Sequence, residues 1–172
     1  MALLDIKKYP EKILKQKAAP IENIDARTQQ LIEDMLDTMY AASGIGLAAN
    51  QVGILQRLCV IDTSQREVKG SLIVLINPLI LDVEGSVEAS EGCLSIPGCS
   101  ATIKRAEKLH VSGLNRDGKP IEIEGSGLLA RVLQHEIDHL DGLLIFDRLS
   151  PIKRKFFKRQ YKKTLSTVAS MK

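Results

Sequence analysis

The first regular pattern in the chain is a stretch in which apolar residues recur at helical spacing. Asp25 can cap a helix that runs to Ala41, and Gly44 and Gly46 follow its end. Five apolar residues inside this stretch share one face: Leu31, Ile32, Met35, Leu36 and Met39. The pattern therefore predicts an amphipathic helix whose charged side chains lie on the solvated face.

Runs rich in β-branched and aliphatic residues follow, and they predict strands. Leu58 to Ile61 is a short apolar run. Leu72 to Leu81 is a longer one, in which Pro78 favours an edge strand or a broken strand because proline cannot donate to a sheet. Lys108 to Leu114 and Pro120 to Glu124 alternate between apolar and polar residues on either side of a turn, which predicts a hairpin.

Two further helices are predicted after these strands. Ser126 can cap a helix from Gly127 to Leu140 that Gly142 closes, and Pro151 takes a favoured early position in a helix from 152 to about 169. The first of these helices carries a core stripe of Leu129, Leu133, Ile137 and Leu140, and beside it a stripe of Leu128, Val132, His135 and His139. Strands between helices without regular βαβ alternation predict an α+β fold.

The length and composition place limits on this fold. A chain of 172 residues can form a single domain, 1–172, with its own core, which Leu, Ile and Val must build because tryptophan is absent. No apolar stretch approaches the roughly 20 residues that cross a bilayer, and the first eight residues do not read as a signal or transit peptide. We therefore expect a cytoplasmic protein with no membrane partner, in which a cysteine can stay a free thiolate.

The net charge of +3 hides an uneven distribution. Residues 1–147 carry 15 basic and 21 acidic residues, a net charge of −6, whereas residues 148–172 carry nine basic residues and no acidic one. An acidic body with a basic C-terminal helix indicates that the helix has a partner of its own.

The strongest chemical signal is the run from Gln134 to His139. His135 and His139 stand four residues apart, so on a helix both imidazoles can reach one divalent metal ion. Glu136 lies roughly 100° further round the helix, beside the ion rather than on it. That is the position of a general base for a water molecule on the metal.

A catalytic metal usually has three protein ligands, so a third must be found. A metzincin-type third histidine would fall at position 145, which is isoleucine, and no Asp or Glu lies between Arg148 and Lys172. The candidates that remain are upstream carboxylates and Asp141, Asp147, His110, Cys59, Cys93 and Cys99.

Among the cysteines, Cys93 stands out by its surroundings. Gly92 precedes it and Pro97-Gly98 follow, which predicts an irregular segment that can bring a thiolate close to a helix. Cys59 fits a buried strand, and Cys99 is the main rival. A disulfide between Cys93 and Cys99 is disfavoured in a chain without a secretion signal.

Three short motifs occur in order along the chain: Gly44 to Gln51 (GIGLAANQ), Glu91 to Ser95 (EGCLS) and His135 to His139 (HEIDH). In these motifs the chain resembles the peptide deformylases, which remove the formyl group from the initiator methionine of nascent bacterial proteins. The resemblance extends over essentially the whole chain. It implies a mixed, mainly antiparallel sheet around a central metal-binding helix, with formyl-methionyl nascent peptides as substrates.

The resemblance also assigns roles to residues. It implies that one divalent ion, Fe²⁺ in the cell with Zn²⁺ or another divalent ion possible after purification, is held by Cys93, His135 and His139. It implies that Glu136 is the general base and that Gln51 and the backbone N–H of Leu94 stabilise the oxyanion. The substrate backbone would pair with Ile45 and Gly46, and the methionine side chain would lie against Leu128 and Val132.

Several expectations lie outside these motifs. Many family members carry an arginine shortly after the cysteine motif, and here residues 98–101 (GCSA) contain none. We expect Asp138 to form a salt bridge with Arg131 or Arg105, His110 to be an ordinary surface histidine, and Phe156 and Phe157 to anchor the basic helix. That helix could contact ribosomal RNA, as in related bacterial deformylases. The competing hypotheses are a general zinc endopeptidase and a non-catalytic binder of nascent chains or RNA.

Overall fold

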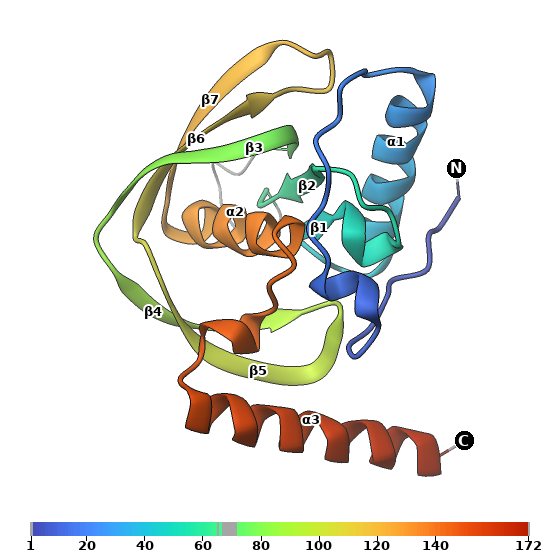
Figure 1. Ribbon diagram of the computed structural model, residues 1–172, viewed down its shortest axis with the longest axis vertical. Helices are drawn as coiled ribbons and strands as arrows, with labels where there is room; N and C mark the ends of the chain where they lie inside the picture. Colours follow the sequence, from blue (N-terminus) through green and yellow to red (C-terminus); the bar gives the residue numbers. More distant parts are fainter. Residues whose placement is uncertain (1, 65, 67–71, 172) are drawn as a thin grey trace.

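The computed structural model describes residues 2–64, 66 and 72–171. Helix α2 (Gly127–Leu140) lies at the centre with strands wrapped around it, while α3 (Pro151–Ser170) lies along the outside of the molecule (Figure 1). This arrangement confirms the predicted α+β fold, a mainly antiparallel sheet around a central helix. None of the helices in the described ranges is long and apolar enough to cross a membrane.

The strands form two antiparallel sheets. The larger has the spatial order β1 (Gly46–Ala48), β2 (Leu58–Asp62), β3 (Leu72–Glu84), β6 (Lys108–Leu114) and β7 (Pro120–Ser126). The smaller consists of β4 (Val87–Cys93) and β5 (Ile96–Arg105). The predicted hairpin is confirmed as β6 and β7, whereas the sequence pattern gave no indication of β4 and β5.

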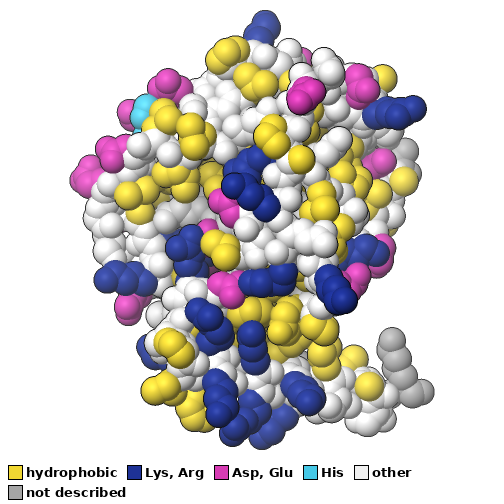
Figure 2. Space-filling model, viewed as in Figure 1, with side chains coloured by type: hydrophobic (Ala, Val, Ile, Leu, Met, Phe, Trp, Pro, Cys, Tyr) yellow, Lys and Arg dark blue, Asp and Glu magenta, His cyan; other side chains and the backbone are white. Residues whose placement is uncertain are grey.

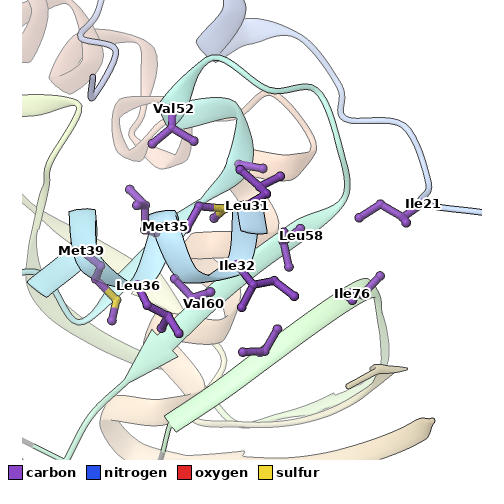
Figure 3. Packing of buried hydrophobic residues seen from close by; sticks show 13 residues of the cluster. Ile21, Leu31, Ile32, Met35, Leu36, Met39, Val52, Leu58, Val60 and Ile76 are labelled. Atoms are coloured by element: carbon purple, nitrogen blue, oxygen red, sulfur yellow. The ribbon is translucent and has the colours of Figure 1, made fainter. Parts of the chain in front are cut away.

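Helix α1 (Ala26–Ala41) begins and ends as its pattern predicts. The Asp25 side chain accepts hydrogen bonds from the backbone N–H groups of Arg27 and Thr28, at 3.0 and 2.9 Å. These bonds satisfy two of the donors that the first turn of a helix leaves without partners. The apolar face of α1 packs against β2 and β3 in one of the hydrophobic clusters (Figure 3).

Pro78 does not place β3 at an edge of the sheet, and that part of the prediction is wrong. β3 lies between β2 and β6, and its register shifts between Ile76 and Leu79. Asn77 within this shift has a positive φ of 52°. A bulge leaves one residue outside the ladder, which allows an interior strand to contain a proline that cannot donate.

Helix α2 is bounded as predicted, with one difference at its start. Ser126 is the residue before the helix, but its side chain makes no capping hydrogen bond. At the other end, Gly142 has φ +76°, and a Cβ there would lie 2.7 Å from the Lys15 carbonyl oxygen. Glycine is therefore required where the chain leaves this helix.

Helix α3 is attached to the body by one face. Phe157 and Tyr161 are buried, four residues apart, whereas Phe156 is 63% exposed. The prediction that both phenylalanines anchor this helix is therefore wrong for Phe156, because consecutive helical residues point about 100° apart. Phe157 packs in a cluster with Phe146, and the Tyr161 hydroxyl donates to the Tyr9 carbonyl at 3.0 Å.

The N-terminal segment bonds to the first two motif segments and to the end of α2, directly after the third motif. Backbone N–H groups donate from Lys7 to the Gln51 carbonyl at 2.7 Å and from Tyr9 to the Ser95 carbonyl at 2.9 Å. Ala18 donates in the same way to the Leu140 carbonyl at 2.8 Å. Residues 7–18 therefore hold together segments that are far apart in the sequence.

Candidate metal centre

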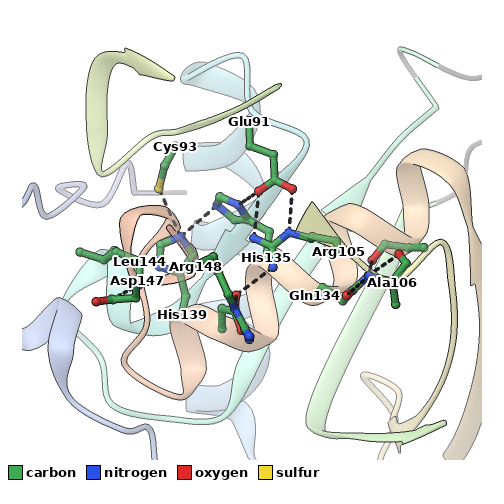
Figure 4. A network of polar contacts seen from close by, with 12 residues as sticks. Glu91, Cys93, Arg105, Ala106, Gln134, His135, His139, Leu144, Asp147 and Arg148 are labelled. Atoms are coloured by element: carbon green, nitrogen blue, oxygen red, sulfur yellow. Dashed lines mark hydrogen bonds and ion pairs between the residues drawn. The ribbon is translucent and has the colours of Figure 1, made fainter. Parts of the chain in front are cut away.

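One face of α2 and the end of β4 bring three ligand atoms together. Cys93 Sγ lies 3.2 Å from His139 Nε2, which lies 3.1 Å from His135 Nε2 (Figure 4). All three ligand atoms lie within 4.8 Å of one another. His139 is buried, and the other two side chains are partly buried.

This set of atoms fits a divalent ion. Two imidazole nitrogens on a tetrahedral zinc ion, each at about 2.0–2.1 Å, are roughly 3.3 Å apart, close to the spacing found here. Thiolate and imidazole are ligands that both zinc and ferrous iron accept. The site therefore suits a metal with three protein ligands and one position open to water or substrate.

The other candidate ligands are engaged elsewhere. Asp141 pairs with Arg57 at 2.7 Å, Asp147 pairs with Lys15, and His110 lies 2.8 Å from Glu122. The remaining two cysteines do not belong to the group of converging ligand atoms: Cys59 is fully buried in β2, and Cys99 Sγ lies 3.8 Å from the Thr164 hydroxyl of α3. All three cysteines are free thiols.

Cys93 is positioned by regular structure, contrary to the irregular segment that its neighbours predict. It is the last residue of β4, and β4 pairs with β5 from Val87 onward. The register shifts between Gly92 and Cys93, so that Cys93 pairs with Ile96 across a tight turn. The glycines and the proline thus shape a hairpin end, and the hairpin brings the thiol to α2.

A carboxylate fixes the orientation of His135. The Glu91 carboxylate lies 3.1 Å from His135 Nδ1 and pairs with Arg105 through two contacts of 2.6 and 2.9 Å (Figure 4). With the proton on Nδ1, Nε2 keeps its lone pair for a metal. Burial would raise the pKa of Glu91, but the bonds to His135 and Arg105 outweigh it and lower that pKa to about 2.

The same network continues to the other side of α2. Arg105 also donates to Asp138 at 2.8 Å, and Arg148 donates to the same carboxylate at 2.9 Å. Of the two expected partners of Asp138, the structure therefore pairs it with Arg105 and not with Arg131. Arg148 is a second partner that the sequence pattern did not indicate.

Glu136 lies beside the centre and is almost wholly buried, with 3% of its surface exposed. Its Oε2 atom has no hydrogen-bond partner among the described residues. Burial raises the pKa of Glu136 to about 7. A Cβ at Gly46 would lie 2.9 Å from the carboxyl carbon of Glu136, so only glycine leaves room for this carboxylate.

Gln51 is also held in a defined orientation. Its Oε1 accepts a hydrogen bond from the Ala48 backbone N–H at 2.9 Å, which turns the amide NH₂ group toward the centre. Nε2 then lies 3.1 Å from Ser95 Oγ and 3.7 Å from Cys93 Sγ. A neutral donor thereby lies in the cleft lining beside the Cys93 thiol.

An open cleft of roughly 330 Å³ lies over these groups. Its lining includes every proposed catalytic and substrate-binding residue, and two of the three ligands: Ile45, Gly46, Gln51, Cys93, Leu94, Leu128, Val132, His135 and Glu136. The remaining ligand, His139, does not line the cleft, but its Nε2 lies 3.1 Å from His135 Nε2 and 3.2 Å from Cys93 Sγ, so the structure brings all of the proposed ligand, catalytic and substrate-binding positions together.

Two residues of the site were not singled out from the sequence. Glu91 orients His135, and Asn50 is fully buried and donates from Nδ2 to the His139 backbone carbonyl. Both lie inside the short motifs, next to residues that were assigned roles. A buried polar side chain beside a metal ligand is the signal that could have identified them.

Comparisons with known proteins agree with this geometry. The sequence profile of the polypeptide deformylase family matches residues 3–155. The peptide deformylase of Thermodesulfovibrio yellowstonii is 59% identical over 162 residues, which cover 94% of this chain and 98% of that protein. The enzyme of Syntrophobacter fumaroxidans is 54% identical over 165 residues, 96% of this chain and 97% of that protein.

Solved structures are similar as well. A crystal structure of a peptide deformylase from Legionella pneumophila has a TM-score of 0.90 and 48% identity, covering 98% of both chains. The Ehrlichia chaffeensis peptide deformylase in complex with actinonin has a TM-score of 0.88 and 38% identity, covering 95% of this chain and 98% of that one. The resemblance found in the three motifs therefore extends to the whole chain and to the fold.

Proposed function

The chain belongs to the polypeptide deformylase family and removes the formyl group from the N-terminal formyl-methionine of nascent polypeptides, and we propose that Cys93, His135 and His139 hold the divalent ion on which this reaction depends. The convergence of one thiol and two imidazoles on one point carries this proposal. Bound there, the ion would polarise the formyl oxygen and lower the pKa of a water molecule toward neutrality.

In this proposal Glu136 moves the proton. Its unpartnered Oε2 atom is free to accept a proton from the attacking water, and the same carboxyl group then delivers the proton to the departing amine. Its burial favours both steps, because a carboxyl group with a pKa of about 7 can accept and release a proton at neutral pH.

Gln51 and Leu94 stabilise the negative charge that develops on the formyl oxygen. The Gln51 amide is already oriented by Ala48, so no reorganisation is needed during the reaction. The backbone N–H of Leu94, at the turn after β4, is the second donor. Two neutral donors stabilise an oxyanion without adding a charge to the ground state.

Substrate binding uses the edge strand of the larger sheet. β1 pairs with β2 along one edge only and lies at the end of the strand order, so a peptide can pair with Ile45 and Gly46 at the cleft. Leu128 and Val132 project from α2 into the same cleft and offer an apolar surface to the methionine side chain. This places the formyl group over His135 and Glu136.

We further propose Fe²⁺ as the ion in the cell, with Zn²⁺ able to take its place, and residues 1–172 as one catalytic domain in the cytoplasm. A free thiolate ligand persists in a reducing compartment. Both ions suit the same three ligands, so the choice depends on metal availability rather than on geometry.

The partner of α3 is proposed to be the ribosome. Lys and Arg side chains gather over this helix at one end of the molecule (Figure 2). Phe157 and Tyr161 hold the helix, which leaves the exposed side chains Lys153, Lys155, Lys162 and Lys163 free for phosphate groups. Formylated chains emerge from the ribosome, so docking there would shorten the path to the substrate.

The experiment that tests the metal centre compares two cysteines. Cys93→Ser is expected to lose bound metal and formate release from a formyl-Met-Ala-Ser peptide, whereas Cys99→Ser is expected to keep both. Metal content and formate are measured on the same preparations. Loss of metal from Cys99→Ser, with Cys93→Ser unaffected, would show that the ligand set is wrong.

A further inference from the structure

The cleft carries two arginines that the reaction described above does not use. Arg66 and Arg131 both line it. Arg131 lies on α2 three residues after Leu128 and four before His135, so these side chains project from one face of the helix. An arginine thus stands beside the apolar surface proposed for methionine, about 6 Å along the helix from a metal ligand.

The charges of these two arginines are not neutralised by the acidic groups of the cleft. Glu91 is engaged with Arg105 and His135, and Glu136 is buried beneath Gly46. Neither Arg66 nor Arg131 forms an ion pair with any residue that the structure describes. Within the described part of the chain, the cleft lining therefore carries two guanidinium groups outside any ion pair, and these can attract an acidic group of an incoming chain.

The path of the substrate leads toward this charge. Ile45 and Gly46 line the same cleft as Leu128, Arg131 and Val132 of α2, so a peptide that pairs with Ile45 and Gly46 lies beside this part of α2. An extended chain advances about 3.3 Å per residue. A peptide whose formyl group lies over His135 and which runs along α2 toward Leu128 would thus reach the level of Arg131, about 6 Å away, by about its second residue.

From this arrangement we infer that Arg131, assisted by Arg66, selects formylated chains with an acidic side chain at the second or third residue. The inference rests on the deformylase site proposed above and adds a sequence preference to it. The aliphatic part of the arginine side chain can lie along the apolar wall while its guanidinium group meets a carboxylate. Arg66 and Arg131 line the cleft of this chain, whereas residues 98–101, where many family members carry an arginine, contain none.

The test compares matched peptides in one hydrolysis assay. The substrates are formyl-Met-Glu-Ala and formyl-Met-Ala-Glu, each paired with the peptide in which Gln replaces Glu. At low salt the wild-type enzyme is expected to favour Glu over Gln by about threefold to tenfold in kcat/KM at one of the two positions, mainly through KM. Added salt should reduce this ratio because the pair is exposed at the cleft mouth.

Variants then assign the preference to residues. Arg131→Gln should bring the Glu-to-Gln ratio to about one, and Arg131→Lys should keep it above one because the charge remains. Arg66→Gln should lower the ratio only in part. Arg27→Gln, which removes an exposed arginine of α1 outside the cleft, is the matched control and should keep the wild-type ratio.

The ratio does not depend on the overall activity of a variant, so a partly impaired Arg131→Gln enzyme still gives an answer. A wild-type ratio of one at both positions, or a ratio that survives Arg131→Gln, would overturn the inference. Failure to hydrolyse any of the four peptides would instead count against the proposed metal site. The two hypotheses are therefore separated by the same measurements.

Discussion

Helices α2 and α3 show two ways of using a helix in one molecule. α2 buries eight of its 14 residues, and three of the others, Leu128, Arg131 and His135, line the cleft. α3 buries two of 20, and its charged side chains face solvent. The burial of α2 fixes the ligand atoms relative to β4, whereas the exposure of α3 leaves most of its surface available for another molecule.

This difference predicts how the two helices respond to substitution. On α2, a change at almost any position moves a ligand, the base or the core that holds them. On α3, only the two buried aromatic side chains should matter for folding, and the lysines should matter for binding. The experiments below test this division, from the largest expected effect to the smallest.

Glu136→Gln should have the largest effect on turnover. The glutamine keeps the shape of the side chain but cannot accept a proton, so kcat should fall by about 100-fold or more. Metal content should stay at the wild-type level because Glu136 is not a ligand. A variant that retained more than a tenth of the wild-type kcat would show that another group serves as the base.

The paired variants Phe157→Ala and Phe156→Ala test the anchoring of α3. Removing the buried Phe157 ring should lower the free energy of unfolding by about 3–5 kcal/mol. Removing the exposed Phe156 ring should change it by less than about 0.5 kcal/mol. Urea denaturation measures both, and equal losses would contradict the assignment of a single buried face.

Glu91→Gln tests whether Glu91 on β4 orients the proposed metal ligand His135 on α2. The loss of the carboxylate leaves His135 Nδ1 with a weaker acceptor and Arg105 with Asp138 as its remaining ion-pair partner. Metal affinity or activity should fall by about 10- to 100-fold, a typical effect for a group that orients a ligand. Glu88→Gln, an exposed neighbour on the same strand, is the control and should leave both unchanged.

The lysines of α3 should affect binding without affecting catalysis. Replacing Lys155, Lys162 and Lys163 with Gln should weaken ribosome binding and lower its salt dependence by about two to three counterions. Hydrolysis of a short formyl-Met peptide should be unchanged. The matched control replaces the exposed body residues Lys12, Lys17 and Lys119, and equal losses in the two triple variants would rule out α3 as the docking surface.

Replacing side chains is a sharper test than truncating the chain after Leu149. Truncation would also remove Phe157 and Tyr161, which pack against Phe146 and bond to Tyr9. A truncated protein could therefore lose ribosome binding merely because its core is damaged. The substitutions separate the charge of the helix from its structural role.

The sequence predicted the parts of the fold in which apolar residues recur in a clear pattern. α1 and α2 were found because each has a buried face at helical spacing, α3 because Pro151 takes a favoured early position in a helix, and β2 because Leu58 to Ile61 is an apolar run. β4 and β5 were missed because β4 has no fully buried residue to contrast with its polar ones. The position of β3 was misjudged because a bulge, which leaves no clear trace in the sequence, accommodates Pro78.

The two histidine ligands and the base were predictable because they lie within five consecutive residues of one helix. Cys93 could be singled out only by its neighbours and by the family resemblance, since its distance from His139 depends on the pairing of β4 with β5. The roles of Glu91, Asn50 and Arg148 depend on contacts between distant segments. No pattern along the chain reports such contacts.

The segment 7–18 also sets the order in which the molecule can be completed during its synthesis. Its partners at Gln51, Ser95 and Leu140 are made later than the segment itself, and Tyr161, whose hydroxyl bonds to Tyr9, is made later still. Ribosomes add residues at about 5–20 per second, so the segment exists for some time before these partners do. The growing chain therefore cannot complete the contacts that this segment makes around the catalytic centre before Leu140 has been translated.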